Sequence, residues 1–318
     1  MLKKYKKSLI FFAAAILIYA VLFVLIDNEI INMYYEQIIV LVSINIILAL
    51  SLNLITGFAG QLALGHAGFM SIGAYAAAMF TVKCNFPFVL SLIMGGLFAA
   101  AFGILIGLPI LRLKGDYLAI TTLGFGEIIR VLITNMDALG GAKGMAGIPL
   151  KTNFTWGYFL ALLTFICIKN IINSTKGRAM IAIREDEIAS EAMGINTTKY
   201  KLMAFAISAM FAGVAGGLYA HYYMFIDPNS FNFMKSIEIV TFVVLGGLGS
   251  LYGSVIATTI LTFLPEFLRE FANLRMVIYP LLLIVIMILK GKGLDKKILG
   301  FRHKIFKKGG EVNVTSSR

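Results

Sequence analysis

The chain has 318 residues, of which 59% are hydrophobic and only 14% are charged. Soluble domains carry close to a quarter charged residues, so a soluble globular fold is excluded and lipid must solvate most of the surface. The net charge of +12 does not indicate nucleic-acid binding, because most Lys and Arg fall in four separate regions: 1–8, 112–114, 169–201 and 290–318. Cytoplasmic segments of membrane proteins are rich in Lys and Arg, so these four regions are predicted to be cytoplasmic.

Apolar runs that can cross a bilayer follow one another along nearly the whole chain. The run 9–26 has the basic start of a secretory signal, but it is 18 residues long and is followed by Asp-Asn-Glu, so we expect a membrane anchor. The region 236–268 is too long for one span and is interrupted by LGGLGSLYG, so we divide it. The predicted spans are 9–26, 36–56, 62–82, 88–111, 117–135, 154–168, 202–222, 236–249, 250–268 and 276–290.

These are ten spans, and an even number places both basic termini on the same side of the membrane, as their charges require. We therefore predict an all-α polytopic integral membrane protein with about ten transmembrane or partly re-entrant helices. It is expected to form one membrane-spanning domain, 1–318. Its cytoplasmic parts would be the N-terminus (1–8), an internal segment (169–201) and the tail (291–318). The loops on the other side are short and are expected at 27–35, 83–87, 136–153, 223–235 and 269–275.

Two glycine-rich blocks interrupt the apolar sequence, one at 56–78 and one at 243–259. Irregular backbone survives in a membrane only where protein buries it or where it lines an aqueous cavity, and paired broken helices in two halves of a transporter often form a midplane site. Close helix packing through small residues accounts for the same glycines, so both interpretations stay open. The candidate substrate-pathway residues are Gly57, Gly60, Gln61, Gly65, His66, Gly68, Gly246, Gly247 and Gly249.

Few ionisable residues interrupt the spans. His66 is either a buried histidine with a structural partner or a hydrogen-bond donor that lines the pathway. His221, at the outer end of a predicted span, is expected at the membrane interface. Glu127 and Arg130 stand three residues apart, so they share a helix face and can pair. The pair is expected to hold two helices together, and the alternative is a functional site, because charges inside a membrane often mark one. Asp116 is expected to cap the helix that follows it.

The segment 169–201, KNIINSTKGRAMIAIREDEIASEAMGINTTKYK, is far more polar than its surroundings. Its isoleucines and alanine at 181, 188, 192 and 195 predict an apolar stripe on one helix, opposite a charged face, with Gly194 ending the helix and Asn196 or Thr197 capping the next span. A solvated connector needs no such stripe, so the pattern favours a docking surface for a soluble partner. The candidate coupling residues are Arg184, Glu185, Asp186, Glu187, Ile188, Glu191, Ala192, Gly194 and Ile195.

The sequence carries no Walker A, HExxH or GxSxG motif, and its two cysteines, Cys84 and Cys167, lack metal-ligand spacing. We therefore expect no catalytic residue, metal or cofactor in this chain, which has no P-loop of its own to bind ATP. An ion-coupled secondary transporter or channel is one alternative, although it would favour more buried acidic residues. A membrane-embedded enzyme is another, but it requires a catalytic cluster that the few histidines and one ion pair supply poorly.

Four ordered motifs, at 56–75, 115–130, 177–196 and 243–257, resemble the LivM-type permease of branched-chain amino acid ABC importers. The similarity runs over most of the chain. One departure lies at 289–295, LKGKGLD, which keeps only the Gly-Leu of the Arg-Pro-x-Gly-Leu sequence common at the end of the family's last span. Little functional consequence is expected, because that stretch is interfacial.

The resemblance implies the permease subunit of an ABC importer that translocates branched-chain or other hydrophobic amino acids across the inner membrane. It also implies the partners: a second permease of LivH type, two cytoplasmic ATPase subunits, an extracytoplasmic amino-acid-binding protein and membrane lipids, with no nucleic acid. In the family, the segment that matches 185–196 is the coupling helix that docks into the ATPase, and Gly194 matches its glycine. Urea or short amides remain alternative cargo, because specificity is expected to rest with the binding protein.

Overall fold

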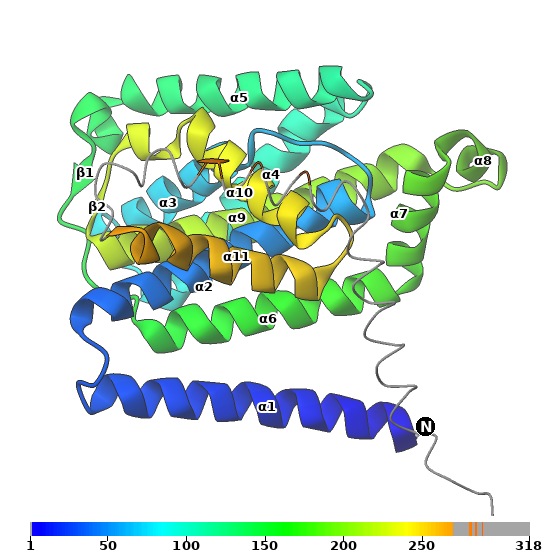
Figure 1. The fold of residues 1–318 in the computed structure, drawn as a ribbon. Helices are drawn as coiled ribbons and strands as arrows, with labels where there is room; N and C mark the ends of the chain where they lie inside the picture. Colours follow the sequence, from blue (N-terminus) through cyan, green and yellow to red (C-terminus); the bar gives the residue numbers. More distant parts are fainter. Residues whose placement is uncertain (1, 270–279, 282–283, 285–287, 289–318) are drawn as a thin grey trace, which may run out of the picture. The chain divides into compact units, whose positions relative to one another are not determined.

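The computed structural model describes residues 2–269 together with residues 280, 281, 284 and 288, and it describes side chains from Ala13 onward. The predicted tail 291–318, and all but those four positions of the predicted span 276–290, lie outside the described residues. The chain divides into two compact units, Met1–Phe263 and Leu264–Arg318, and the packing below is that of the first unit. Most of its described residues are helical, which confirms the all-α prediction (Figure 1).

The helices follow the predicted spans closely. They are α1 (Leu2–Asp27), α2 (Met33–Asn53) with a π-helical turn (Leu54–Phe58), α3 (His66–Val82), α4 (Phe88–Ile110), α5 (Asp116–Thr134), α6 (Phe154–Asn173), α7 (Thr175–Glu185), α8 (Glu187–Ala192), α9 (Thr197–Tyr223), α10 (Phe233–Gly246) and α11 (Leu251–Phe267). Short 3-10 turns lie at Asp137–Leu139, Gly141–Lys143 and Pro228–Phe231. Strands β1 (Met145–Ala146) and β2 (Phe225–Ile226) pair antiparallel and join two of the predicted outer loops.

Five described helices are long and apolar enough to cross a membrane: α2 with its π-helical turn, α4, α5, α6 and α9. Both glycine-rich blocks break the helical chain. Residues 59–65 are not helical, and residues 247–250 separate α10 from α11. The division of 236–268 into two helices is therefore confirmed, whereas the total number of spans stays a prediction.

The core is formed by α2, α3, α4 and α9, which Figure 1 shows between α5 and α6. Small residues bring α3 and α9 together. A Cβ at Gly73 would overlap the backbone of Gly213, and a Cβ at Gly216 would overlap the carbonyl of Met70. Glycines let helix backbones approach closely in lipid, where van der Waals contact rather than water exclusion drives association. For this part of the first glycine block, the packing interpretation is the one observed.

Replacing Gly73 by alanine is expected to lower the melting temperature of the detergent-purified permease. The added Cβ would push α3 away from the backbone of Gly213, and such overpacking costs about 1–3 kcal/mol. Gly124→Ala in α5 is the matched control, because no atom lies within 4 Å of the Cβ that it would add. Equal melting temperatures for the two variants would contradict the packing of α3 on α9.

Two expectations about polar residues are wrong. Asp116 does not cap α5, because it is the first residue of that helix and follows Gly115, whose φ of +57° sets the turn into it. His221 does not face the membrane interface. It is fully buried at the end of α9, where its ring lies 2.8 Å from the hydroxyl of Thr81 in α3 and meets the edge of Phe88 in α4. The neighbouring helices, rather than lipid headgroups, cover the last turns of α9.

Candidate functional site

The first glycine block opens the chain between α2 and α3. The π-helical turn Leu54–Phe58 ends α2, and residues 59–65 then have no helical structure until α3 begins at His66. Buried and exposed residues alternate along this segment, as they do along a strand. Gly60 has a φ of +71°, which glycine adopts without the steric penalty of a side chain.

Asn53, the last residue of α2, ties the first glycine block to the second. Its Nδ2 donates to the carbonyl of Ser250 at 3.1 Å and to Oγ of Ser254 at 2.9 Å, while its Oδ1 accepts from the amide of Gly249 at 2.9 Å. A Cβ at Gly57 would overlap both Oδ1 of Asn53 and the amide of Gly249. Gly57 is therefore required for the two breaks to meet, and one buried side-chain amide joins α2 to the turn between α10 and α11.

Arg184 brings the polar segment to the same place. From the end of α7, its Nη1 donates to the carbonyl of Gly57 at 2.8 Å. This carbonyl belongs to a helix end, where backbone oxygens lack intrahelical partners and carry partial negative charge. The side chain also packs on both breaks, because a Cβ at Gly60 would come within 2.7 Å of its Cγ and a Cβ at Gly249 within 3.0 Å of its Nη1. We call Asn53, Gly57, Gly249 and Arg184 the glycine junction.

His66 is buried at the start of α3, and its Nε2 lies 2.9 Å from Oγ of Ser51 in α2. Within the described part of the chain, its Nδ1 has no hydrogen-bond partner, and neither has Oε1 of Gln61, which is also buried. A buried polar atom without a partner is costly, so such atoms mark places where a ligand or water would be stabilised. The contact to Ser51 is the structural partner expected of a buried histidine, while the pathway role of His66 and Gln61 stays a prediction.

Hydroxyl groups from two other helices satisfy the backbone amides at the start of α3. Ser236 of α10 accepts from the amide of Ala67 at 3.1 Å, and Thr122 of α5 accepts from the amide of Leu64 at 2.9 Å. Gly65 permits this approach, because a Cβ there would overlap the carbonyl of Thr122. The positive dipole end of α3 lies here, and the first amides of a helix have no partner within the helix, so these hydroxyls supply the acceptors. The break is therefore held by α5 and α10 as well as by α2.

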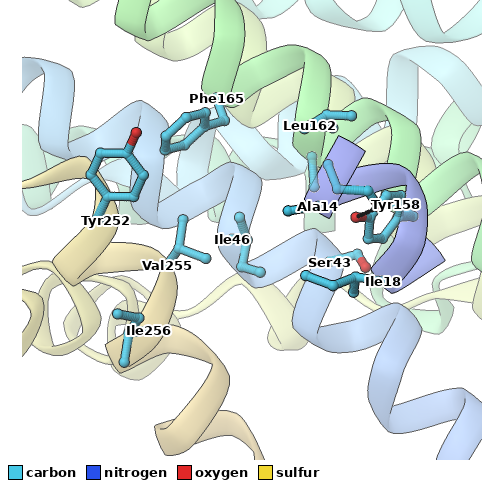
Figure 2. Close-up of a pocket in the computed structure, with 12 residues that line it drawn as sticks. Ala14, Ile18, Ser43, Ile46, Tyr158, Leu162, Phe165, Tyr252, Val255 and Ile256 are labelled. Atoms are coloured by element: carbon cyan, nitrogen blue, oxygen red, sulfur yellow. Dashed lines mark hydrogen bonds between the residues drawn. The ribbon is translucent and has the colours of Figure 1, made fainter. Parts of the chain in front are cut away.

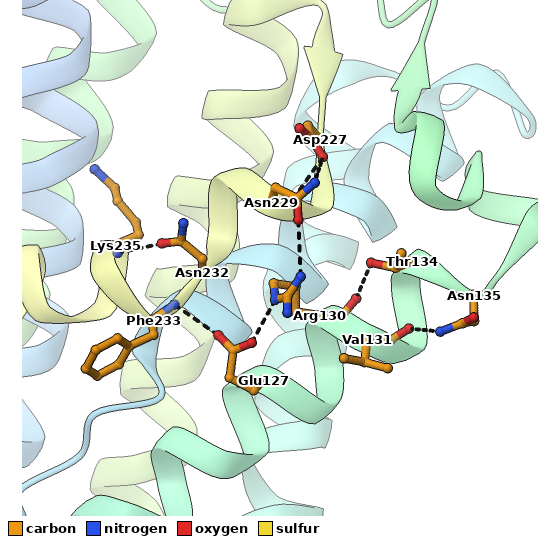
Figure 3. A network of polar contacts seen from close by, with 10 residues as sticks. All are labelled: Glu127, Arg130, Val131, Thr134, Asn135, Asp227, Asn229, Asn232, Phe233 and Lys235. Atoms are coloured by element: carbon orange, nitrogen blue, oxygen red, sulfur yellow. Dashed lines mark hydrogen bonds and ion pairs between the residues drawn. The ribbon is translucent and has the colours of Figure 1, made fainter.

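The predicted pair Glu127–Arg130 is confirmed and forms part of a larger network (Figure 3). Oε2 of Glu127 accepts from Nε of Arg130 at 2.7 Å, and Oε1 accepts from the amide of Phe233 at 3.0 Å. Nη1 of Arg130 donates to Oδ1 of Asn229 at 3.1 Å. Glu127 thereby satisfies the N-terminus of α10, and Arg130 holds the turn before it. The pair ties α5 to α10 as a structural contact between helices.

The polar segment forms two helices rather than the single one that was predicted. Asp186 has an extended backbone, with φ of −155°, and its carboxylate accepts from the amide of Ala189 at 3.0 Å, which makes Asp186 the N-cap of α8. The continuous apolar stripe is therefore wrong, because α7 and α8 run in different directions (Figure 1). The predicted end of the helix at Gly194 (φ +81°) and the capping of α9 by Asn196 are confirmed.

The two carboxylates of α8 contact neighbouring parts of the same chain. The carboxylate of Glu187 lies 2.7 Å from Nζ of Lys201 in α9 and 3.6 Å from Nζ of Lys114, and Glu191 accepts from the hydroxyl of Thr197 at 2.6 Å. Burial alone would raise the pKa of Glu187, but the hydrogen bond and charge of Lys201 and the charge of Lys114 lower this pKa below its ordinary value. The carboxylate is therefore ionised at neutral pH, and it fastens α8 to α9 and to the α4–α5 connection.

The large apolar side chains of α8 and its C-terminal cap point into solvent. Ile188 is 77% exposed and Met193 is 83% exposed. The sequence predicted a docking surface with an apolar stripe opposite a charged face, and Ile188 of that stripe is solvent-exposed. The role of these two side chains in docking a soluble partner stays a prediction.

Sequence reasoning found both glycine blocks and the polar segment, but it did not find the residues that join them. Asn53, Ser51, Ser236 and Lys201 were missed. The available signal was the presence of polar residues such as Ser51 and Asn53 within apolar runs, because polar side chains inside a membrane protein form hydrogen bonds between helices. Arg184 was predicted as a contact to the partner, whereas its side chain points to Gly57.

Comparison with known proteins places this architecture in a family. The family model for the permease component of the branched-chain amino acid transport system matches residues 34–289. The high-affinity branched-chain amino acid transport system permease protein LivM of Escherichia coli K12 is 37% identical over 258 residues, covering 70% of this chain and 61% of that relative. LivH of the same organism is 39% identical over 103 residues, or 32% of each chain. The fructose import permease protein FrcC of Rhizobium meliloti is 26% identical over 189 residues, 55% of this chain and 52% of FrcC. No solved structure matches the chain.

Apolar helices bonded to one another across two backbone breaks, with a polar helical segment attached to the breaks, define a polytopic membrane permease. The chain belongs to the family of permease components of branched-chain amino acid transport systems. It spans 61% of the length of the LivM relative.

Proposed function

We propose that this chain is the permease subunit of an ATP-binding cassette importer for branched-chain or other small hydrophobic amino acids in a bacterial inner membrane, with both termini cytoplasmic. Membership of the permease family supports the transport class. The transport system to which the LivM and LivH relatives belong supports branched-chain amino acids as cargo and a second permease as partner. Two cytoplasmic ATPase subunits would bind the ATP, and an extracytoplasmic binding protein would deliver the amino acid.

The observation that carries the coupling part of this proposal is the bond from Arg184 to the carbonyl of Gly57. An ATPase that docks on the exposed face of α8 displaces α8 and α7 together. Arg184 carries this displacement to the end of α2, and Asn53 carries it on to Gly249 between α10 and α11. Movement outside the membrane thus reaches both helix breaks through two consecutive hydrogen-bonded contacts.

A second route runs through the ion pairs of Glu187. Lys201 lies in the first turns of α9, the helix that packs on α3 and α4. Its side chain is only 10% exposed, so separating it from Glu187 leaves a buried charge without its counter-ion, which is strongly unfavourable. α8 and α9 therefore move as one body, and a rigid shift of α8 is not absorbed locally.

The transport class is tested by reconstitution. The permease, its partner permease and the two ATPases are placed in proteoliposomes with binding protein outside, and uptake of labelled leucine, isoleucine and valine is measured with and without ATP inside. We expect uptake only with ATP and with an ATPase whose Walker A lysine is intact. Competition by unlabelled urea or fructose distinguishes other cargo from amino acids. Uphill uptake by this chain alone under an ion gradient would overturn the proposal in favour of a secondary transporter.

A further inference from the structure

An apolar groove runs between α1, α2, α6 and α11 (Figure 2). Its volume is about 270 Å³. The side chains that line it are mainly aliphatic and include Ile18, Ile46, Leu162, Val255 and Ile256. Along α6 the groove extends from Tyr158 to Phe165, which corresponds to roughly 10 Å of helix at 1.5 Å per residue. The groove is therefore long and narrow.

The polar atoms in the groove are already occupied by the protein. The hydroxyl of Ser43 donates to the carbonyl of Ile39 at 3.1 Å, and the hydroxyl of Tyr158 donates to the carbonyl of Ala15 at 2.7 Å. The hydroxyl of Tyr252 accepts from Nζ of Lys169 at 3.1 Å. A ligand in this groove would contact aliphatic side chains and hydroxyl groups that already have hydrogen-bond partners. The groove therefore fits an alkyl chain and provides few hydrogen bonds to a polar solute.

One end of the groove is cationic. Nζ of Lys169 lies 5.6 Å from the ring centroids of both Phe165 and Tyr252, so its ammonium sits at the aromatic end of the groove. Tyr252 also lines a second hollow of about 300 Å³, together with Lys169, Asn173 and Ser250. An apolar groove thus continues into a polar, basic recess beside the start of the polar segment.

We propose that this composite site binds one anionic phospholipid, with an acyl chain in the groove and the phosphate at Lys169. A helix of a partner protein is about 10–12 Å wide with its side chains and does not enter a groove of this size. Basic recesses between membrane helices on the cytoplasmic side bind anionic headgroups, and Lys169 lies at the end of α6 that leads into the basic segment 169–201. The site does not depend on which solute the permease carries.

Binding selectivity rests on the charge, because an acyl chain gains little by leaving other lipid for an apolar groove. One basic residue near the membrane surface favours an anionic lipid about fivefold. Lys169→Gln should therefore reduce labelling of the groove by anionic lipid about fivefold and leave labelling by zwitterionic lipid unchanged. Lys176→Gln, an exposed lysine of α7 outside both hollows, is the matched charge control.

The test uses the full-length permease complex in nanodiscs that contain phosphatidylglycerol with a diazirine in one acyl chain, followed by peptide mass spectrometry after illumination. Labelling should concentrate on Ile46, Leu162 and Val255. Val255→Trp fills the groove and should abolish it, whereas Ile260→Trp on the same helix, a residue that does not line the groove, should not. Val255→Phe provides a second filling variant where tryptophan prevents assembly.

Two results would overturn the proposal. One is labelling spread equally over the exposed faces of α4 and α5 and over the groove, which would mean ordinary boundary lipid. The other is labelling of the groove by phosphatidylcholine as strong as by phosphatidylglycerol, which would leave Lys169 without a role. Neither result depends on an uptake measurement, so the lipid site and the transport function are tested independently.

Discussion

Replacing Arg184 by alanine is expected to reduce ATP-driven uptake at least about tenfold while the permease still binds its ATPase, because a hydrogen bond to a charged group contributes roughly 1.5–3 kcal/mol. The guanidinium joins α7 to the carbonyl of Gly57 and packs beside Gly60 and Gly249. Without it, α8 can move without displacing the end of α2. ATP hydrolysis should then continue with little transport, which is the signature of uncoupling.

Arg184→Lys should restore little of the uptake. The planar guanidinium of Arg184 bonds Gly57 and Glu185 at the same time, and an ammonium group on a flexible chain does not reproduce this fixed geometry. Arg178→Ala is the control, because Arg178 lies on the same helix and its guanidinium bonds only the nearby carbonyl of Asn173 in the contacts observed. The measurements are leucine uptake, ATPase rate and copurification of the ATPase. Normal uptake by Arg184→Ala would rule out the glycine junction as the route of coupling.

The sequence predicted the helices well because length and hydropathy decide them in a membrane. The breaks at Gly60 and at Gly247–Gly249 were predictable for the same reason, since a run of 33 residues cannot cross once and clustered glycines disturb a helix. The caps were also predictable where the residue type decides them. Asn196 is the N-cap of α9, a position that its side-chain oxygen favours. Gly194 follows the end of α8 with a positive φ, which glycine adopts because it has no side chain.

The orientation of the polar segment was not predictable, because it depends on contacts between residues far apart in the chain. Glu187 turns inward because Lys201 lies in the next helix and Lys114 in an earlier connection. Asp186 has an extended backbone and caps α8, so it separates α8 from α7. The predicted stripe required one continuous helix, and its residue spacing does not hold across this break. The junction of Asn53 with Gly249 joins residues 196 positions apart, and no local pattern carries such a pairing.

The double replacement Ile188→Asp with Met193→Asp is expected to detach the ATPase from the permease. Both side chains are more than three-quarters exposed, and burial of one large apolar side chain contributes about 1.5–3 kcal/mol. Losing two of them should weaken the affinity for the ATPase by at least about a hundredfold. Copurification from mild detergent measures this directly, and Ile188→Leu with Met193→Leu is the control that keeps apolar surface. An ATPase that remains bound to the aspartate variant would show that α8 is not its docking site.

The aspartate variant and Arg184→Ala distinguish two steps, binding of the ATPase and coupling of its movement to transport. A measurement of uptake alone would not distinguish them. The first should lose the ATPase and with it both stimulated hydrolysis and transport. The second should keep the ATPase bound and hydrolysing while leucine uptake fails, since Ile188 and Met193 are unchanged and only the bond to Gly57 is gone. If both variants lost the ATPase equally, Arg184 would be part of the docking surface, as the sequence first indicated. A displacement at α8 would then have to reach the helix breaks through Lys201 and α9 instead.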